Sequence, residues 1–215
     1  MQKPGSFFDK WARDGMGEGM EEGHWPRVKQ AFDLINPMEG NFLDVGVGNG
    51  YVLKHTALNQ FSKGRCLGID ISSEMVEVAG ENIQEIENAE VRQGDFLSMD
   101  FSGWSPFSMI FSMEVFYYFS DIQAGINRAS ELLKPGGELW ILVDYYEENE
   151  YCQTWPEDLG IEMTMWSKAD YIEGFQKAGF KDIRQMIFPE KRPHRVAEGD
   201  LGTLCTNGVK KLSNF

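Results

Sequence analysis

The feature that most constrains the fold of this chain is a repeated change of hydrophobic period along its length. A short apolar run at residues 41–46 is typical of a buried strand, and strand-like segments follow at 65–70, 89–95, 107–112, 138–145 and 181–188. Segments whose apolar residues recur at helical spacing separate most of these runs, and the last such segment covers 168–180. Strands that alternate with helices of about 10 to 15 residues predict a parallel sheet with helices on both faces. We therefore expect a doubly wound, three-layer α/β fold with a mainly parallel sheet.

The charge balance argues against a nucleic-acid partner. The chain has 20 Lys and Arg residues against 34 Asp and Glu residues, a formal net charge of −14. Nucleic-acid binders gain much of their affinity from Lys and Arg side chains that neutralise backbone phosphates. The basic cluster formed by Lys191, Arg192, His194 and Arg195 is too short to outweigh the acidic remainder. We expect no nucleic acid among the partners.

The cysteines and the apolar runs bear on the cell compartment. Cys66, Cys152 and Cys205 indicate neither a disulfide framework nor a zinc motif, and no His, Cys or carboxylate residues fall at metal-ligand spacing. The N-terminal residues contain no apolar signal region, and runs such as 139–143 are far shorter than the roughly 20 residues that cross a bilayer. We therefore expect a cytoplasmic protein with no membrane span and no metal site.

A glycine-rich segment follows the first predicted strand. It begins with Asp44 and places Gly46, Gly48 and Gly50 at alternate positions. Glycines there let the backbone adopt positive φ angles and approach a ligand closely, and the helix that follows adds N–H donors for an anionic group. Alone, this pattern also occurs in plain turns. The third glycine of the G-x-G-x-x-G pattern of nicotinamide cofactors would fall on Tyr51, which argues against a dehydrogenase.

Two more carboxylates stand at the ends of the second and third predicted strands. Asp70 is placed to accept hydrogen bonds from both hydroxyls of a ribose, and a cap for the helix that starts near Ser73 is the alternative explanation. Asp95 is placed to accept from an adenine amino group with Phe96 against the ring, although an ordinary turn explains this segment too. Because the carboxyl ends of parallel strands share one edge of a sheet, the three motifs together favour an adenosine-type ligand.

With these residues in this order, the chain resembles the class I S-adenosylmethionine-dependent methyltransferases of the small-molecule type, such as the ubiquinone and menaquinone biosynthesis enzymes. The resemblance covers roughly residues 41–185. LDVGVGNG is similar to the glycine-rich first motif of the family, IDIS to its acidic second motif and QGDF to its adenine-contacting motif. SMEVFYYFSD is similar to the segment after the fourth strand, with Tyr118 where many relatives have His. LLKPGGELWIL is similar to the Pro-Gly-Gly turn before the fifth strand.

The resemblance implies a Rossmann-like methyltransferase fold that ends in an antiparallel edge hairpin, supplied here by 181–188 and a strand within 202–209. It implies S-adenosyl-L-methionine as cofactor and S-adenosyl-L-homocysteine as product. Asp44 would steady the glycine loop or the methionine amino group, Asp70 the ribose and Asp95 the adenine. The implied cofactor-binding residues are Asp44, Gly46, Gly48, Gly50, Asp70, Ile71, Met75, Asp95, Phe96, Ser112 and Met113.

A single domain accounts for the chain, because 215 residues are too few for two ordinary domains. We expect 1–40 to form an N-terminal helical cover, 41–144 the cofactor-binding core, 145–166 a substrate-side insertion or lid, and 167–215 a C-terminal helix and edge strands. The insertion is acidic and aromatic, which favours a cationic or amine-bearing acceptor; a solvated charged loop explains the same residues.

Methyl transfer from a sulfonium is an in-line displacement, so the main task of the enzyme is to hold nucleophile, methyl carbon and sulfur collinear and dry. An alcohol or ammonium acceptor also needs a base for its proton. The candidate residues for this role are His24, Tyr118, Asp144 and Tyr145. We expect methyl transfer to a small-molecule acceptor by a monomer or a homodimer.

Two other functions stay open at this point. One is a nicotinamide-dependent oxidoreductase on a Rossmann sheet, and the other is a non-catalytic module that binds S-adenosylmethionine. Binding of S-adenosylhomocysteine without binding of NADH excludes the first. Transfer of a labelled methyl group excludes the second.

Overall fold

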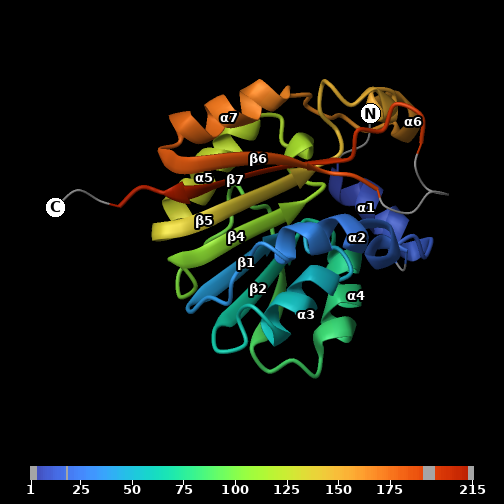
Figure 1. The fold of residues 1–215 in the computed structure, drawn as a ribbon. Coiled ribbons are helices and arrows are strands. Elements are labelled where there is room, and N and C mark those ends of the chain that lie inside the picture. Colours follow the sequence, from blue (N-terminus) through green and yellow to red (C-terminus); the bar gives the residue numbers. More distant parts are fainter. Residues whose placement is uncertain (1–3, 18, 191–196, 213–215) are drawn as a thin grey trace.

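Seven strands form one sheet in this computed structural model, which describes residues 4–17, 19–190 and 197–212 (Figure 1). Their order across the sheet is β3-β2-β1-β4-β5-β7-β6. The strands are β1 Asn41–Val45, β2 Arg65–Asp70, β3 Ala89–Gln93, β4 Phe107–Met113, β5 Leu133–Val143, β6 Phe180–Phe188 and β7 Thr203–Lys210. Strands β1 to β5 pair in parallel, whereas β7 runs antiparallel to both β5 and β6. This arrangement confirms the predicted doubly wound fold and its antiparallel edge hairpin.

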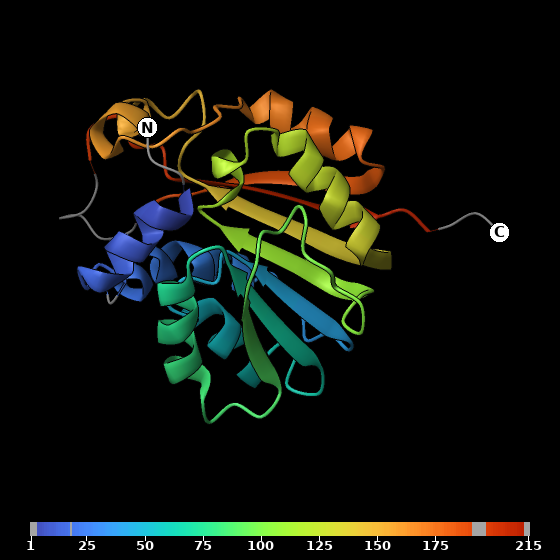
Figure 2. The ribbon, with the colours of Figure 1, turned by 180° about the vertical axis from the view of Figure 1, so that it is seen from behind.

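Helices cover both faces of the sheet and complete three layers (Figures 1 and 2). One face carries α2 Met20–Phe32, α3 Tyr51–Leu58 and α4 Ser73–Ile83, and the other carries α5 Ile122–Leu132 and α7 Lys168–Lys177. Successive side chains of β1 alternate between the two cores, since Phe42 packs with the first set of helices and Leu43 with the second. Because both faces are covered, every residue of β4 is buried, as is typical of parallel strands.

The largest difference from the predicted elements lies at the start of β5. The sequence predicts that Pro135 and Gly136 stop a helix and that the strand begins at residue 138. Instead α5 ends at Leu132 and β5 begins at once with Leu133. Gly136 adopts a φ of +78°, and the pairing with β4 shifts register at this point. The Pro-Gly-Gly segment is therefore a bulge within the strand rather than a turn before it.

Smaller differences concern the ends of other elements. The strand predicted over 89–95 ends at Gln93, because the Asp95 side chain starts a turn by accepting the Leu97 N–H. The helix predicted over 168–180 ends at Lys177. The segment 145–166 contains two short helices, η2 Glu150–Cys152 and α6 Trp155–Leu159. The predicted basic cluster of Lys191, Arg192, His194 and Arg195 lies outside the described residues.

Two helices, α1 Pro4–Arg13 and α6, lie beyond the carboxyl ends of the parallel strands (Figures 1 and 2). Two polar contacts hold α1 to the start of α4: the Ser72 hydroxyl donates to Asp9 at 2.7 Å, and Arg13 pairs with Glu74 at 3.1 Å. None of the α1 residues is fully buried, so this helix covers the sheet edge without joining the core. In the described part of the chain, no helix is both long and apolar enough to span a bilayer.

Candidate functional site

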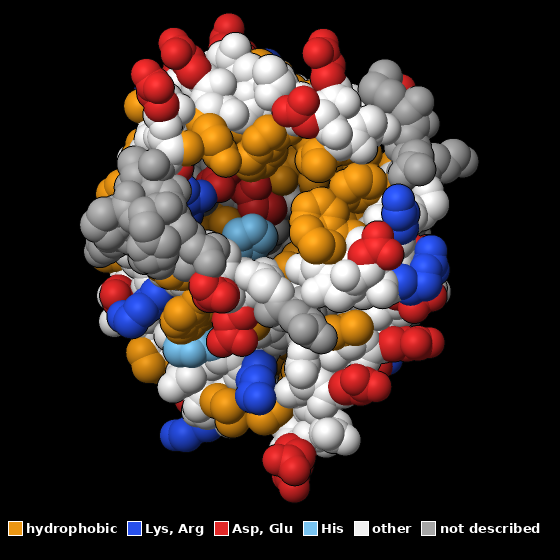
Figure 3. All heavy atoms as spheres, turned by 90° about the vertical axis from the view of Figure 1, so that its right-hand side faces the viewer, with side chains coloured by type: hydrophobic (Ala, Val, Ile, Leu, Met, Phe, Trp, Pro, Cys, Tyr) orange, Lys and Arg blue, Asp and Glu red, His pale blue; other side chains and the backbone are white. Residues whose placement is uncertain are grey.

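A cavity of about 800 Å³ opens at the carboxyl edge of the parallel strands. The ends of β1 to β4 form its floor, and α1, α2, α6 and the short helix η1 Phe116–Tyr118 form its sides. Figure 3 shows the hollow from outside, with hydrophobic side chains around it and acidic and His side chains within. Trp11, Met16 and Leu159 line both this cavity and a neighbouring groove between α1 and α6, so these helices form its mouth.

The glycine loop after β1 forms one wall. Gly46, Gly48 and Gly50 have φ angles of +75°, +53° and +85°, in a region that residues other than glycine rarely adopt. Gly46 and Gly48 line the cavity, whereas Gly50 lies outside its lining and precedes α3 as the N-cap. A Cβ at Gly46 would stand 2.1 Å from Cγ2 of Val115. The loop is therefore closely packed against the segment that follows β4.

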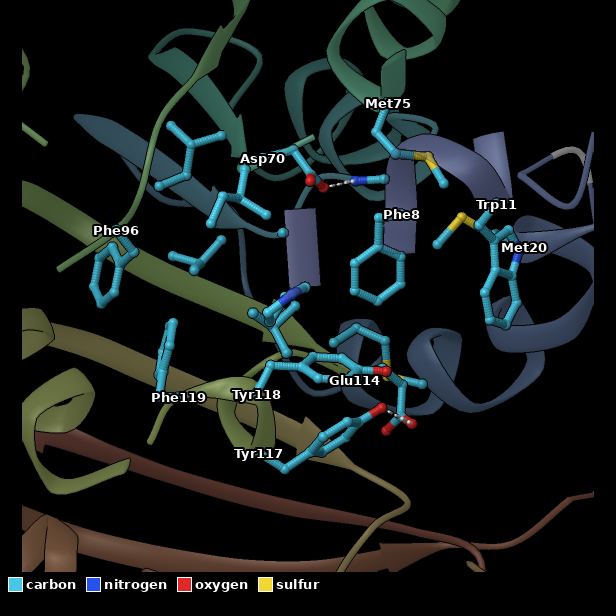
Figure 4. A pocket seen from close by; sticks show the side chains of 18 of the residues that line it. Phe8, Trp11, Met20, Asp70, Met75, Phe96, Glu114, Tyr117, Tyr118 and Phe119 are labelled. Atoms are coloured by element: carbon cyan, nitrogen blue, oxygen red, sulfur yellow. Dashed lines mark hydrogen bonds between the residues drawn. The ribbon is translucent and has the colours of Figure 1, made fainter. Parts of the chain in front are cut away.

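Asp70 at the end of β2 connects this loop to the next strand. One carboxylate oxygen accepts the Gly48 N–H at 3.0 Å, as Figure 4 shows, and the other accepts the Ser72 N–H at 3.0 Å. Burial raises the pKa of Asp70, and these backbone donors oppose that shift. Ser72, rather than Asp70, is the cap of α4, since its hydroxyl accepts the Met75 N–H. Asp70 also lines the cavity, so the structure leaves it in reach of a ligand.

Asp95 and Phe96 continue the wall at the end of β3. The Asp95 carboxylate accepts from the Leu97 N–H and the Ser98 hydroxyl at 3.0 and 3.1 Å. Phe96 is 3% exposed and stacks on Phe119, with ring centroids 6.1 Å apart. The remaining predicted residues that reach the cavity are Ile71, Met75 and Met113.

Two predicted cofactor residues lie behind the cavity wall rather than on it. Asp44 is 2% exposed and accepts the Leu53 N–H at the start of α3, and its Oδ2 atom has no hydrogen-bond partner. Burial, reinforced by Asp70, raises the pKa of Asp44. The Ser112 hydroxyl donates to the Val45 carbonyl at 3.0 Å and connects β4 to β1. Both side chains are buried in the packed interior, and neither belongs to the cavity lining.

The opposite wall contains a polar group that sequence reasoning missed. Glu114 follows β4 and has a φ of +61°. Its Oε2 accepts the Tyr117 hydroxyl at 2.9 Å, as Figure 4 shows, and its Oε1 accepts the Asp144 N–H at 2.5 Å. The Tyr118 ring lies beside that of Tyr117, with ring centroids 4.4 Å apart. Burial raises the pKa of Glu114 well above 4.5. An acidic residue directly after a strand was the available signal, as it was for Asp70.

Of the four catalytic candidates, His24 and Tyr118 line the cavity. Burial and then Arg27 lower the pKa of His24 from 6.5 to about 4, so its imidazole is neutral near neutral pH. Burial raises the pKa of Tyr118, so its phenol stays protonated. Tyr118 also packs edge-on against Phe8 of α1, with ring centroids 5.2 Å apart.

The structure places the other two candidates elsewhere. Asp144 forms a buried ion pair with Arg27 of α2 and accepts the Thr203 hydroxyl. Arg27 also pairs with Asp200 at 2.7 Å, so this network ties α2 to the ends of β5 and β7. Tyr145 is 4% exposed and packs behind the wall, against Tyr117 and Trp155. Neither side chain belongs to the cavity lining.

The acidic insertion contributes less charge to the cavity than its composition indicates. Only Trp155, Asp158 and Leu159 of the insertion line it, and Glu148 instead accepts the backbone N–H of Lys168 at the start of α7. Among the described residues that line the cavity, none is Lys or Arg. The described residues also contain no group of three or more His, Cys, Asp and Glu side chains suited to a metal ion.

Known proteins resemble this chain in both sequence and fold. A family model described as a methyltransferase domain matches residues 38–181. The uncharacterized methyltransferase YcgJ of Bacillus subtilis is 38% identical over 112 residues, which cover 50% of this chain and 42% of that protein. The first four curated relatives are matched over only 37–42% of their own length.

Solved structures show the same likeness over a larger share of the chain. A methyltransferase in complex with the Trm112 methyltransferase activator of Haloferax volcanii is 31% identical, with a TM-score of 0.84 over 99% of this chain and 100% of that chain. The N-methyltransferase NodS of Bradyrhizobium japonicum, in complex with S-adenosyl-L-homocysteine, is 16% identical, with a TM-score of 0.67 over 88% of this chain and 86% of that chain. The second match shows likeness of fold alone.

The cavity suits S-adenosyl-L-methionine, because bare glycine backbone and two strand-end carboxylates face it, and no Lys or Arg among its described lining residues would repel a cation. The family model covers about two thirds of the chain and includes every strand from β1 to β5. The chain therefore belongs to the methyltransferase-domain family, whose cofactor is S-adenosyl-L-methionine.

Proposed function

We propose that this chain transfers the methyl group of S-adenosyl-L-methionine to a small-molecule acceptor. One observation carries this proposal: a single cavity joins the glycine loop and Asp70 to the polar wall formed by Glu114, Tyr117 and Tyr118 (Figure 4). Its volume of about 800 Å³ lies within the range of about 300 to 1,000 Å³ common among small-molecule sites. Such a cavity has room for a donor on one side and an acceptor on the other.

The proposed cofactor side is the floor formed by β1 to β3. Asp70 would accept from ribose hydroxyls with the lone pairs that Gly48 and Ser72 leave free, and Asp95 would accept from the adenine amino group. Phe96 would flank the ring. When bound, the cofactor supplies an electrophilic methyl group on a sulfonium.

The residues of this chain would then position the acceptor and exclude water. Phe8 and Trp11 of α1, together with Trp155 of α6, form an apolar cover over the strand ends. Holding two reactants in line within such an enclosure can remove about 7 to 11 kcal/mol of the barrier. The wall opposite Asp70 offers hydroxyl and carboxylate groups to orient the acceptor atom.

Equilibrium binding and methyl transfer test this proposal directly. Titration calorimetry should detect S-adenosylhomocysteine but not NADH, and label from the donor methyl group should appear in an acceptor from a metabolite mixture. Asp95→Asn should weaken S-adenosylhomocysteine binding by about tenfold, since Asp95 lines the cavity. Asp100→Asn is the matched control, because Asp100 caps a turn in the same way through Ser102 but lies outside the lining. No binding of S-adenosylhomocysteine would refute the function.

A second proposal concerns a protein partner. The Haloferax methyltransferase that this chain resembles over its whole length is bound to the Trm112 activator. We propose that this chain also binds a small activator protein of the Trm112 kind. Co-expression with Haloferax volcanii Trm112 should yield a co-purifying complex with a higher melting temperature and faster methyl transfer than the chain alone. Size-exclusion chromatography that shows only unmixed species, with unchanged activity, would contradict it.

A further inference from the structure

We propose that the methyl acceptor is an amine, held as an ammonium ion between the Glu114 carboxylate and the rings of Tyr117 and Tyr118. This inference rests on the methyl-transfer function proposed above and names its substrate class. The carboxylates of the insertion at 145–166 do not supply this site, because most of them do not line the cavity. Glu114 instead comes from the end of β4, in the centre of the sheet.

The charges on the cavity wall favour a cationic acceptor. Asp70 and Asp95 stand on the floor, and Glu114 and Asp158 stand on the opposite wall and at the mouth. His24 adds no positive charge near neutral pH. Arg27 lies behind this wall, paired with Asp144 and Asp200, so the charged groups of the lining itself are carboxylates. They would repel an anionic acceptor and attract a cation in a partly dry site where Coulomb interactions are strong.

The conformation of Glu114 indicates a role beyond packing. Its φ of +61° lies in the left-handed region that residues other than glycine rarely occupy. The Asp144 N–H and the Tyr117 hydroxyl each donate to a different carboxylate oxygen and hold the side chain in place. Each oxygen keeps one lone pair for a further donor. An ammonium group, with N–H donors and no acceptor, matches this arrangement.

Aromatic rings complete the proposed ammonium site. The rings of Tyr117 and Tyr118 lie 4.4 Å apart at an angle of 56°, and Phe8 of α1 packs against Tyr118. Figure 4 shows the Tyr118 and Phe8 rings between Asp70 and Glu114, on the path from floor to opposite wall. Ring faces attract cations, most strongly where water is excluded. The same ring faces would hold the apolar part of the amine.

In the proposed reaction, Glu114 is the base that accepts the proton of the ammonium ion. The ammonium gives one proton to the Glu114 carboxylate, whose burial raises its pKa well above 4.5 and so brings its basicity closer to that of the amine. The freed nitrogen lone pair forms the new N–C bond, and the C–S bond breaks with its electron pair going to sulfur. The products are S-adenosylhomocysteine and the methylated ammonium, and Glu114 returns its proton to solvent.

A competing explanation is that Glu114 serves the positive charge of the cofactor itself. The two explanations predict different effects of Glu114→Gln on the ratio of the affinities for S-adenosylmethionine and S-adenosylhomocysteine. If Glu114 contacts the sulfonium, Glu114→Gln lowers the affinity for S-adenosylmethionine but not for the uncharged sulfur of S-adenosylhomocysteine. If Glu114 holds the acceptor amine, the ratio of these two affinities stays unchanged in Glu114→Gln, while amine binding falls.

Titration calorimetry on the protein saturated with S-adenosylhomocysteine tests the inference. The probes are matched sets of amine, alcohol and carboxylate: 2-phenylethylamine, 2-phenylethanol and 3-phenylpropanoate, and the corresponding butyl compounds. At least one amine should bind about tenfold more tightly than its alcohol, and no carboxylate should bind as tightly. Glu114→Gln should abolish this preference. Glu157→Gln, an exposed change on α6 outside the cavity lining, should keep it.

A second variant keeps the test valid if Glu114→Gln fails to fold. Asp158→Asn alters an exposed residue at the mouth and should lower amine affinity by about threefold. Equal binding of amine and alcohol, preferred binding of a carboxylate, or a reduced S-adenosylmethionine to S-adenosylhomocysteine affinity ratio in Glu114→Gln would each overturn the inference. Absence of S-adenosylhomocysteine binding in the wild type would instead refute the proposed function.

Discussion

Replacing Gly46 with Ala is the most demanding test of how the glycine loop is built. The residue has a φ of +75°, and an added Cβ would stand 2.1 Å from Cγ2 and 3.3 Å from Cβ of Val115. The loop has little freedom to withdraw, because the Gly46 and Val47 N–H groups both donate to the Ile69 carbonyl, at 2.9 and 2.8 Å. The Val115 side chain must therefore move, and both Gly46 and Val115 line the cavity, so we expect Gly46→Ala also to bind S-adenosylhomocysteine more weakly.

The expected magnitude combines two independent costs. A left-handed conformation costs a non-glycine residue about 1 to 2 kcal/mol. Forcing an extra methyl group into a packed site costs about 1 to 3 kcal/mol more. The sum is a loss of about 2 to 5 kcal/mol in the free energy of unfolding. For a chain of this length, each kcal/mol lowers the melting temperature by about 2 to 4 °C.

A second glycine separates the two costs. Gly103 has a φ of +82°, but a Cβ there would have no atom within 4 Å. Gly103→Ala should therefore lose only the conformational part, about 1 to 2 kcal/mol, and keep its affinity for S-adenosylhomocysteine. Urea unfolding followed by circular dichroism gives both free energies, and calorimetry gives the affinities. The reasoning fails if Gly46→Ala is no less stable than Gly103→Ala, or if it binds S-adenosylhomocysteine as tightly as the wild type.

Three buried groups give further predictions. Burial and then Arg27 lower the pKa of His24 from 6.5 to about 4. Between these two pH values the unfolded chain binds a proton at His24 that the folded chain does not. The free energy of unfolding therefore falls by about 3 kcal/mol as pH drops from 6.5 to 4. His24→Gln should lose that part of the slope in urea unfolding at several pH values, and an unchanged slope would contradict the assignment. Asp144→Ala should cost about 3 kcal/mol in the same assay, because Arg27 loses a buried partner, while S-adenosylhomocysteine affinity of the folded protein changes by less than about twofold. Ser112→Ala should cost about 1 kcal/mol, since the Val45 carbonyl loses a donor; a tenfold loss of affinity would show instead that Ser112 touches the cofactor.

The fold could be predicted because its signals are local. Strands β1, β2 and β4 are short, largely apolar runs that a glycine or a carboxylate follows, and some helices have a side-chain cap of their own, such as Ser72 for α4. The glycines of the first loop adopt the positive φ angles that their position implied. Asp70 and Asp95 face one cavity because they end neighbouring parallel strands, and the strand order places them on the same edge.

Other residues depended on contacts that no local pattern contains. Asp144 follows β5 just as Asp70 ends β2, yet its side chain is taken by Arg27, 117 positions away in the sequence. The direction of Glu114 depends on a single φ angle of +61° that the sequence pattern does not reveal. Tyr145 lies behind the cavity wall, where its ring packs against those of Tyr117 and Trp155. Position at a strand end was therefore a useful signal for a site residue but not a sufficient one.

The elements that form the two sides of the cavity differ in their separation along the sequence. The part of the floor that comes from β1 to β3 lies within residues 41–97, where neighbouring strands follow one another closely in the sequence. The opposite side is assembled from α1, α2, η1 and α6, which span residues 4–159 and meet only in the folded chain. A change in any of these four helices would alter the proposed acceptor side while the floor keeps its strand-end carboxylates. A likeness of fold alone, such as that to NodS at 16% identity, therefore does not identify an acceptor, which we seek in Glu114 after β4 and in the side chains of these helices.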